Sequence, residues 1–313
     1  MSETAAISAE SLGKIYYLGV RRRAVEALRE VSFEVKQGEV FAFLGLNGAG
    51  KTTTIKLLLD HARPSTGRCA LFGVDSRAPA SRSRVGYMPD LPNFYRFLTA
   101  PELLDYFGRL HSLNRLDRLE RTRKLVALVG LEGREHEPLK GFSRGMLQRL
   151  GLAQALIGDP ALLILDEPLG GLDPIGRFEF RNIISSLKKE GRTIFFSSHI
   201  LEDAEKIADR VGIIHRGTLV ASGALSQLVS QGAGYELELR SPSDIQALER
   251  AAEQQSWKLS RNGSTISLAV PDEAGIREVM RLALGGDAVV TSITPQRKSL
   301  EEMFIAELEK WKR

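Results

Sequence analysis

Residues 45–52 read Gly45-Leu46-Asn47-Gly48-Ala49-Gly50-Lys51-Thr52 and fit the pattern G-x-x-x-x-G-K-[ST]. The preceding apolar run at residues 40–44 predicts a strand, and residues 52–61 have the apolar periodicity of a helix. A strand, a glycine loop and a helix in this order are the context that a phosphate-binding loop requires. The stretch therefore predicts that the chain binds a nucleotide.

Each residue type in this loop has a physical role. Glycines allow backbone N–H groups to surround the phosphates, and the N-terminus of the following helix adds positive potential. We expect Lys51 to contact the β and γ phosphates and the Thr52 hydroxyl to ligate Mg²⁺. The candidate nucleotide-binding residues are Gly45, Leu46, Asn47, Gly48, Ala49, Gly50, Lys51, Thr52 and Thr53. Kinases, GTPases, helicases and transporters share such a loop, so it does not select the reaction.

A second apolar run, residues 161–165, ends in Asp166 and Glu167. Open α/β sheets bind ligands at the carboxyl ends of their strands. We expect Asp166 to hold Mg²⁺ and Glu167 to orient and polarise the attacking water. Two acids after a strand commonly form a surface turn or a helix cap. In a chain that also contains a phosphate loop, the pattern favours Mg²⁺-dependent hydrolysis.

The rest of the N-terminal region predicts an α/β fold with a helical insertion. Apolar residues recur at helical spacing over residues 101–131. The apolar runs at residues 161–165 and 193–196 each follow a helical segment, as buried parallel strands with crossover helices do. We therefore expect a parallel sheet in this part of the chain.

The sequence pattern changes after residue 232. The expected elements are strands at 235–239, 257–259, 265–270 and 288–293, helices at 243–253 and 272–284, and a last helix at 299–311. The order βαββαβ is typical of a small ferredoxin-like α+β domain. We therefore expect a second, C-terminal domain.

The composition limits the partners and the compartment. The formal net charge is only +4, so we expect no nucleic-acid partner, and the basic run at residues 21–23 is assigned no function. Cys69 is the single cysteine, which excludes an internal disulfide and fits a reducing compartment. Residues 1–10 lack a signal-peptide core, and no apolar run approaches the roughly 20 residues that cross a bilayer. We expect a soluble, cytoplasmic chain.

Four further motifs resemble those of the ABC ATPases. Phe142-Ser143-Arg144-Gly145-Met146, followed by Gln148-Arg149, resembles the ABC signature, usually spelled LSGGQ. Gly170-Gly171-Leu172-Asp173 resembles the D-loop, Ser197-Ser198-His199 the switch histidine, and Gly86-Tyr87-Met88-Pro89 the lead into the Q-loop. The order and spacing of these motifs carry the resemblance, which spans residues 7–228.

The resemblance implies a domain organisation. It implies a P-loop ABC-type ATPase domain over residues 7–228, with a helical subdomain at about residues 91–157. Residues 232–313 would form the C-terminal accessory α+β domain.

The resemblance also implies roles for single residues. Ser143, Gly145 and Met146 would contact the ATP held by a second copy of the chain, so that two ATP molecules lie between two chains. His199 would contact the γ-phosphate and help to hold Glu167 and the water. Tyr16, or alternatively Tyr17, would stack on adenine.

The chain departs from the family pattern at two of these positions. Asp90 stands where the Q-loop usually has Gln, a site associated with Mg²⁺, the water and coupling to a membrane subunit. Asp90 keeps an acceptor oxygen, so it joins the catalytic and Mg²⁺ candidates. Met146 replaces the final Gln of the signature and retains only the backbone N–H contacts. Neither change affects Lys51 or Glu167, so we expect an active ATPase.

The end of the chain narrows the subclass. Residues 292–304 resemble the ending common among ATPases of ABC-2-type export systems. This implies that the chain powers a separately encoded multi-spanning permease from the cytoplasmic face of the cell membrane. The intact set of motifs makes a homodimer of two identical chains workable. The alternative for the C-terminal region is a dimer or regulatory surface.

Two other functions fit parts of this sequence. A non-transport ABC ATPase acting on a soluble macromolecule is the alternative, but the segment between Lys51 and Asp166 is too short for the coiled coil of DNA-repair relatives. Translation-factor relatives carry two cassettes, whereas this sequence shows one. A small-molecule kinase leaves the signature and His199 unexplained.

Overall fold

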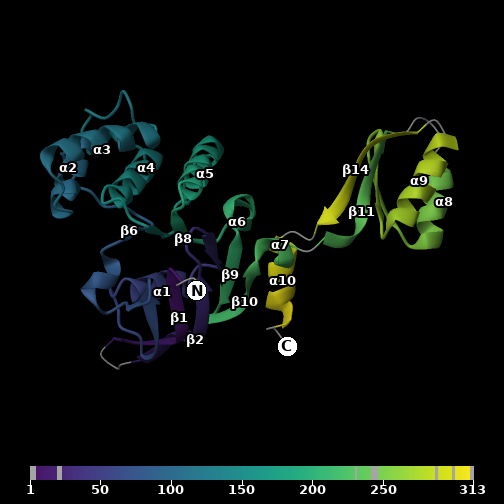
Figure 1. Ribbon diagram of the computed structural model, residues 1–313. Helices are drawn as coiled ribbons and strands as arrows, with labels where there is room; N and C mark the ends of the chain where they lie inside the picture. Colours follow the sequence, from purple (N-terminus) through teal and green to yellow (C-terminus); the bar gives the residue numbers. More distant parts are fainter. Residues whose placement is uncertain are drawn as a thin grey trace. The chain divides into compact units, whose positions relative to one another are not determined.

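The computed structural model describes residues 5–19, 23–229, 231–240, 246–285, 288–297 and 300–310 (Figure 1). One compact unit runs to Leu225, and a second extends from Ser226 to Lys310. Arg21 and Arg22 of the basic run lie outside the described residues. The first residues of the helix expected at 243–253 and both ends of the helix expected at 299–311 also lie outside them.

A six-stranded sheet carries the first unit, in the order β10-β9-β3-β8-β7-β6. The strands are β3 (Val40–Leu44), β6 (Val85–Met88), β7 (Leu162–Leu165), β8 (Thr193–Ser198), β9 (Arg210–His215) and β10 (Thr218–Ala224). All neighbours are parallel except β9 and β10. Every residue of β3, β7 and β8 is buried. The predicted buried parallel strands are confirmed.

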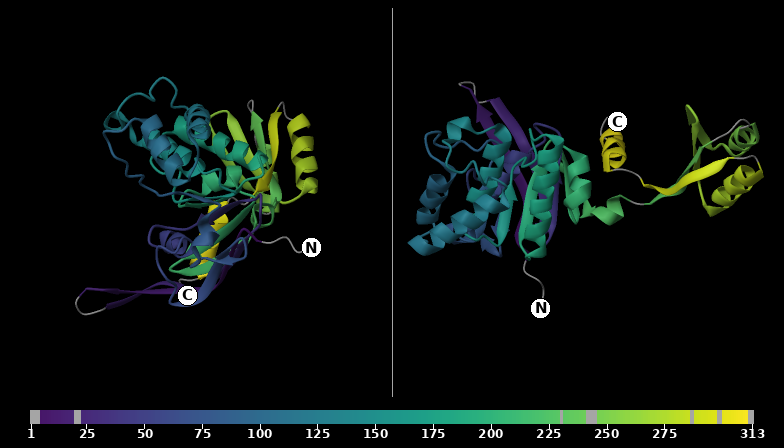
Figure 2. Two further views of the ribbon diagram at one scale, coloured as in Figure 1. Left: turned by 60° about the vertical axis from the view of Figure 1, so that its left-hand side comes forward. Right: turned by 90° about the horizontal axis from the view of Figure 1, so that it is seen from above.

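A second, antiparallel sheet has the order β2-β1-β4-β5. Its strands are β1 (Ile7–Leu18), β2 (Arg23–Val35), β4 (Thr66–Leu71) and β5 (Val74–Asp75). β1 and β2 form a long two-stranded ribbon (Figure 2). The apolar pattern of residues 28–35 predicts a strand there, which is the C-terminal part of β2, and the sequence predicts no other strand of this sheet. The register shifts of β1, with a positive φ of 47° at Ser11, interrupt the alternation that would have predicted that strand.

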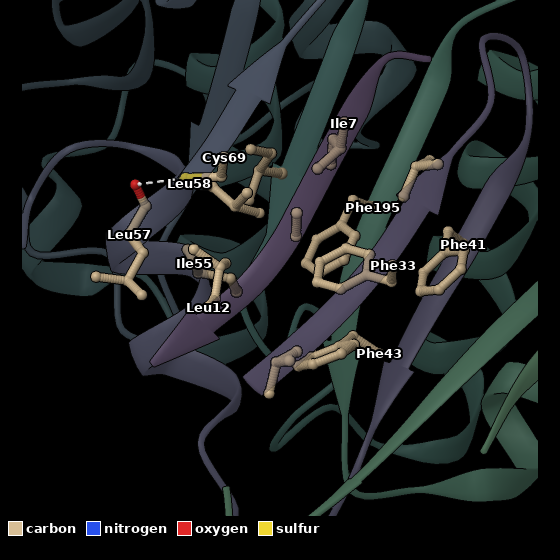
Figure 3. Packing of buried hydrophobic residues seen from close by; sticks show 14 of the residues in the cluster. Ile7, Leu12, Phe33, Phe41, Phe43, Ile55, Leu57, Leu58, Cys69 and Phe195 are labelled. Carbon is tan, nitrogen blue, oxygen red and sulfur yellow. Dashed lines mark hydrogen bonds between the residues drawn. The ribbon is translucent and has the colours of Figure 1, made fainter. Parts of the chain in front are cut away.

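Four phenylalanines pack between the two sheets (Figure 3). Phe33 of β2 lies 5.3–5.8 Å, between ring centroids, from Phe41, Phe43 and Phe195. Phe41 and Phe195 also stack at 5.9 Å with an interplanar angle of 8°. Phe41 and Phe43 belong to β3, and Phe195 belongs to β8. This cluster therefore packs the antiparallel sheet against the strands that lead into the predicted site.

The helices of the first unit are α1 (Lys51–Leu58), α2 (Ala100–Leu110), α3 (Arg115–Leu128), α4 (Arg144–Leu156), α5 (Pro174–Lys189) and α6 (Leu201–Ile207). The side chains of Thr99, Asn114, Ser143 and Asp173 cap α2, α3, α4 and α5. Helices α2, α3 and α4 gather into one group (Figure 1). The helix expected at residues 52–61 ends early, at Leu58, because Asp60 turns the chain with a φ of 57°.

The second unit has the predicted element order. It contains β11 (Gln231–Arg240), α8 (Gln246–Gln255), β12 (Lys258–Asn262), β13 (Thr265–Val270), α9 (Glu273–Gly285) and β14 (Val289–Arg297). The antiparallel sheet order β12-β13-β11-β14 is that of a ferredoxin-like domain. Its core includes Leu237, Leu239 and Val279. The short α7 (Leu225–Leu228) precedes this domain, and α10 (Leu300–Lys310) follows it.

Over the described part of the chain, every helix is too short or too polar to cross a bilayer.

Replacing Phe195 by alanine should lower the free energy of unfolding by about 3–5 kcal/mol, because the change leaves a cavity among three other rings. Urea unfolding followed by far-ultraviolet circular dichroism would measure the change. Phe178→Ala is the matched control, since that ring is 58% exposed on α5 and its loss should cost within about 0.5 kcal/mol. An unchanged midpoint for Phe195→Ala would contradict the packing described here.

Candidate nucleotide-binding and catalytic site

At two positions of the loop between β3 and α1, the backbone leaves room for glycine only. A Cβ atom at Gly45 would lie 2.4 Å from the carbonyl oxygen of Ile214. Gly50 has a φ of 116°, and a Cβ there would lie 2.7 Å from Leu28 Cδ2. Gly50 also precedes α1 without a side-chain cap, which leaves the first N–H groups of that helix to a ligand. This geometry fits the phosphates of a nucleotide.

Lys51 lies inside the loop, with its side chain 6% exposed. Its Nζ donates to the carbonyl oxygens of Gly45 at 2.6 Å and Leu46 at 3.3 Å. The same nitrogen lies 3.0 Å from Oε1 of Glu167. Thr52 is exposed and Thr53 half-buried at the start of α1. The loop therefore holds one buried cation at its centre, beside two hydroxyl side chains.

The remaining loop residues form its outer and inner surfaces. Leu46, Asn47 and Gly48 are exposed, whereas Ala49 is buried. The N–H of Ala49 donates to the carbonyl oxygen of Leu46 at 3.1 Å, which closes the turn.

Asp166 and Glu167 follow β7, beside the end of β8. Because Leu165 pairs with Phe196 in parallel register, the next residues of both strands emerge at the same edge. The Ser197 hydroxyl donates to Oδ1 of Asp166 at 2.6 Å and accepts from the N–H of Glu167 at 2.9 Å. The serine thus fixes both acids at the edge of the sheet.

Ser197 had no role of its own in the sequence prediction. Its signal was a hydroxyl at the end of a buried apolar run, at the carboxyl edge of a parallel strand. Gln148 of α4 was also missed, and its side-chain amide donates to the carbonyl oxygen of Glu167 at 3.3 Å. Sequence alone does not reveal these contacts, because the partners lie on different elements.

The Glu167 side chain links two other predicted site residues. Its Oε1 faces Nζ of Lys51, and its Oε2 lies 2.8 Å from Nδ1 of His199 at the end of β8. Oε1 is buried, and its contact with Nζ of Lys51 at 3.0 Å is an ion pair. Glu167 also has a φ of 48°, in the left-handed region that non-glycine residues rarely adopt. Such strain is concentrated at functional sites.

Asp90 follows β6, the strand beside β7, and is half-exposed. Partial burial, and then the negative charges of Asp166 and Glu167, raise the pKa of Asp90 above its ordinary value. Nη2 of Arg144 lies 4.0 Å away and opposes this shift. A cation bound beside these three carboxylates would relieve the repulsion that Asp90 experiences from the other two.

The oxygen donors fit a magnesium ion only if phosphate oxygens complete its shell. Among the described residues, no group of three or more His, Cys, Asp or Glu side chains could hold a metal by itself. Mg²⁺ commonly takes one or two protein carboxylates together with substrate phosphates and water. Asp166, Asp90 and the Thr52 hydroxyl are residues of the type that such a site needs.

The signature residues form a separate surface. Ser143 caps α4 by accepting from the N–H of Met146 at 3.2 Å, as expected. Ser143, Gly145 and Met146 line a cavity of about 600 Å³ together with Gly171 and neighbouring residues. Of the described residues that line it, none comes from the phosphate loop. The cavity at the signature residues is therefore distinct from the phosphate loop.

Tyr16 lies in the antiparallel sheet. It pairs with Val25 across β1 and β2, and Nζ of Lys14 lies 4.9 Å from the centroid of its ring. Tyr17 is the more exposed of the two tyrosines. The stacking role expected for Tyr16 stays a prediction.

Known proteins match the chain over most of its length. A family model described as ABC transporter matches residues 28–170. An uncharacterized ABC transporter ATP-binding protein of Synechocystis sp. is 41% identical over 307 residues, covering 95% of this chain and 83% of the relative. The bacitracin transport ATP-binding protein of Bacillus licheniformis is 35% identical over 288 residues, covering 90% of this chain and 92% of that protein.

A solved structure also resembles the fold. The ATP-binding subunit of an ABC transporter has a TM-score of 0.64 and 32% sequence identity, and the match covers 71% of this chain and 91% of that one.

Ser197→Ala should lower the kcat of nucleotide hydrolysis by about 10- to 100-fold, because Asp166 loses its donor and the N–H of Glu167 loses its acceptor. A steady-state phosphate-release assay would measure it. Ser81→Ala is the control, since this buried hydroxyl donates to the carbonyl oxygen of Ala78, outside the site. Its kcat should stay at the wild-type value. Equal rates for both variants would refute the bridging role.

Proposed function

The chain belongs to the family of ABC transporter ATP-binding proteins, and we propose that two copies of it pair around ATP to power a separate membrane permease. Membership makes the protein an ATP-binding subunit and an ATP hydrolase. The observation that carries the catalytic assignment is the line formed by Lys51, Glu167 and His199, with contacts of 3.0 and 2.8 Å.

We propose a role for each residue of this line. Lys51 and the loop N–H groups bind the β and γ phosphates, and Glu167 orients the attacking water and draws on its proton. His199 holds the Glu167 carboxylate through the contact of its Nδ1 at 2.8 Å, and its other ring nitrogen contacts the γ-phosphate. Asp166, Thr52 and Asp90 hold Mg²⁺, which neutralises charge on the phosphate oxygens when bound.

The homodimer proposal rests on the separation of the two nucleotide-binding surfaces. Ser143 begins α4 at the rim of a cavity that contains no residue of the loop among those described. A helix N-terminus favours a phosphate. If the signature of one copy faces the loop of the other, each ATP gains a second set of N–H donors, and ATP itself joins the two chains.

The permease proposal rests on a groove lined in part by Pro89, the residue before Asp90. Its cavity of about 370 Å³ is lined by Tyr87, Pro92, Phe94, Phe107 and other residues. Nearby residues of the same segment expose large apolar side chains, with Tyr95 63% and Phe97 74% exposed. Exposed aromatic clusters of this kind mark protein-binding surfaces. We infer that a cytoplasmic segment of the permease binds here, which places the chain at the cytoplasmic face of the membrane.

Export is the proposed direction of transport. The bacitracin transport protein of Bacillus licheniformis matches this chain over both units, and the sequence of residues 292–304 resembles the ending of export ATPases. We propose that residues 7–228 act as the ATPase domain and that residues 232–313 act as an accessory domain. A non-transport role on a soluble macromolecule is the alternative that the experiments below distinguish.

Glu167→Gln should lower the kcat of ATP hydrolysis at least about a hundredfold, because the amide keeps the shape of the side chain and loses its charge. ATP binding should persist, since the phosphate loop is unchanged. An equilibrium binding assay would measure the affinity for ATP. Size-exclusion chromatography should show a dimer with ATP and a monomer with ADP. Hydrolysis at the wild-type rate would show that Glu167 is not the catalytic base.

The ATP-bound Glu167→Gln protein should capture a polytopic membrane protein from detergent extracts, identified by mass spectrometry. Adding Tyr95→Ser and Phe97→Ser should reduce its recovery, because these changes remove the exposed aromatic groups. Leu284→Ser in the second unit, where the side chain is also exposed, is the control and should leave recovery unchanged. Recovery of soluble partners alone would favour the non-transport function.

A further inference from the structure

We propose that Arg177 is a positioning residue that, through Asp203, holds the helix after His199 against the segment of residues 170–173. His199 then stays in contact with Glu167 during hydrolysis. The inference rests on the proposed roles of His199 and Glu167, and it adds Arg177 as a residue that keeps His199 in place. Its starting point is a buried carboxylate that the catalytic line does not use.

Asp203 lies on α6 with its side chain 3% exposed. Nη1 of Arg181 donates to its Oδ1 at 2.6 Å, and Nη1 of Arg177 lies 3.9 Å from its Oδ2. Both arginines lie on α5, four residues apart, and therefore on the same face of that helix. Oδ2 is buried and accepts no hydrogen bond from the part of the chain that the structure describes. The carboxylate is thus clamped between two cations, with one oxygen available to Arg177.

Arg177 makes a second contact, on its other side. Its Nε donates to the carbonyl oxygen of Leu172 at 3.3 Å. Leu172 directly precedes Asp173, whose carboxylate caps α5 by accepting from the N–H of Gly176 at 2.7 Å. One guanidinium therefore joins the backbone of residues 170–173 to α6. An ammonium group could not reach both partners in this way, because the two contacts use different nitrogens of a planar group.

The position of α6 bears directly on His199. The helix begins at Leu201, two residues after the histidine, and the corner is closed by the Ser198 hydroxyl, which accepts from the N–H of Ile200 at 2.9 Å. The start of α6 has no side-chain cap, and the helix has only seven residues. Its placement therefore depends on packing and on the Asp203 contacts. A shift of α6 would move His199 away from Oε2 of Glu167.

Stability alone is a weak explanation for this arrangement. A buried ion pair loses the hydration of both charges, and well-packed apolar residues often stabilise a core as well or better. What such a pair supplies is a fixed geometry between two elements. Here the elements are the helix after the proposed switch histidine and the segment that precedes α5.

Arg177→Gln is the sharpest test. Arg181 continues to neutralise Asp203, so the variant should fold with a melting temperature close to that of the wild type. We expect the kcat of ATP hydrolysis to fall about tenfold or more while the KM for ATP changes less than about twofold, because the phosphate loop is untouched. Arg177→Lys keeps the charge and should show the same loss, since it cannot make both contacts.

Glu202→Gln is the matched control. Glu202 lies on α6 next to Asp203, and its carboxylate is exposed and pairs with Lys206 of the same helix. Its kcat should equal that of the wild type. Asp203→Asn provides a second measurement and should reproduce the selective loss of kcat in the fraction that folds.

The outcomes separate this inference from the proposed function. Wild-type kcat in Arg177→Gln would overturn the positioning role, as would full rescue by Arg177→Lys. A KM increase without a kcat change would also overturn it, because the effect would then lie in binding. If the proposed catalytic assignment fails, a different result is expected: Glu167→Gln would hydrolyse ATP at the wild-type rate.

Discussion

The site depends on the parallel register of three neighbouring strands. Leu44 of β3 lies opposite Ser198 of β8, and Leu165 of β7 lies opposite Phe196. Since all three strands run the same way, the glycine loop, the two acids and His199 leave the sheet at one edge. Side chains distant in sequence then meet within 3.0 Å without any long insertion to bring them together. The aromatic cluster between the sheets packs β2 against two of these strands, β3 and β8.

The buried parallel strands could be predicted from the sequence because their signal is local. An apolar run that ends in glycines or acids indicates both a strand and the side chains at its carboxyl end, which is why Lys51, Asp166 and Glu167 could be chosen. The antiparallel strand β1 could not be, because bulges interrupt its alternation. The contacts of Ser197 and Arg177 join separate elements, and no spacing along the chain reports on them.

A departure from the family pattern also acquires a structural context. Asp90 replaces the usual glutamine with a charge, and the structure places Arg144 of the signature helix 4.0 Å from it. The same guanidinium lies over Gly171, where a Cβ atom would come within 2.5 Å of its carbon Cζ. The charge of Asp90 in the Q-loop segment is thus balanced by Arg144 of the signature segment. Arg144 also lies against Gly171 of the D-loop segment. Reading the motifs one by one would treat the aspartate as a simple loss of the glutamine side chain.

The left-handed backbone at Glu167 limits what mutation can do at this position. A φ of 48° is tolerated by glycine and, less easily, by asparagine and aspartate, whereas β-branched side chains strongly disfavour it. Variation toward valine would therefore strain the main chain as well as remove the acid, and would be selected against twice. Inactive descendants of this protein should have glycine, asparagine or aspartate at position 167 more often than any β-branched residue. The backbone conformation would therefore still restrict this position after the catalytic activity was lost.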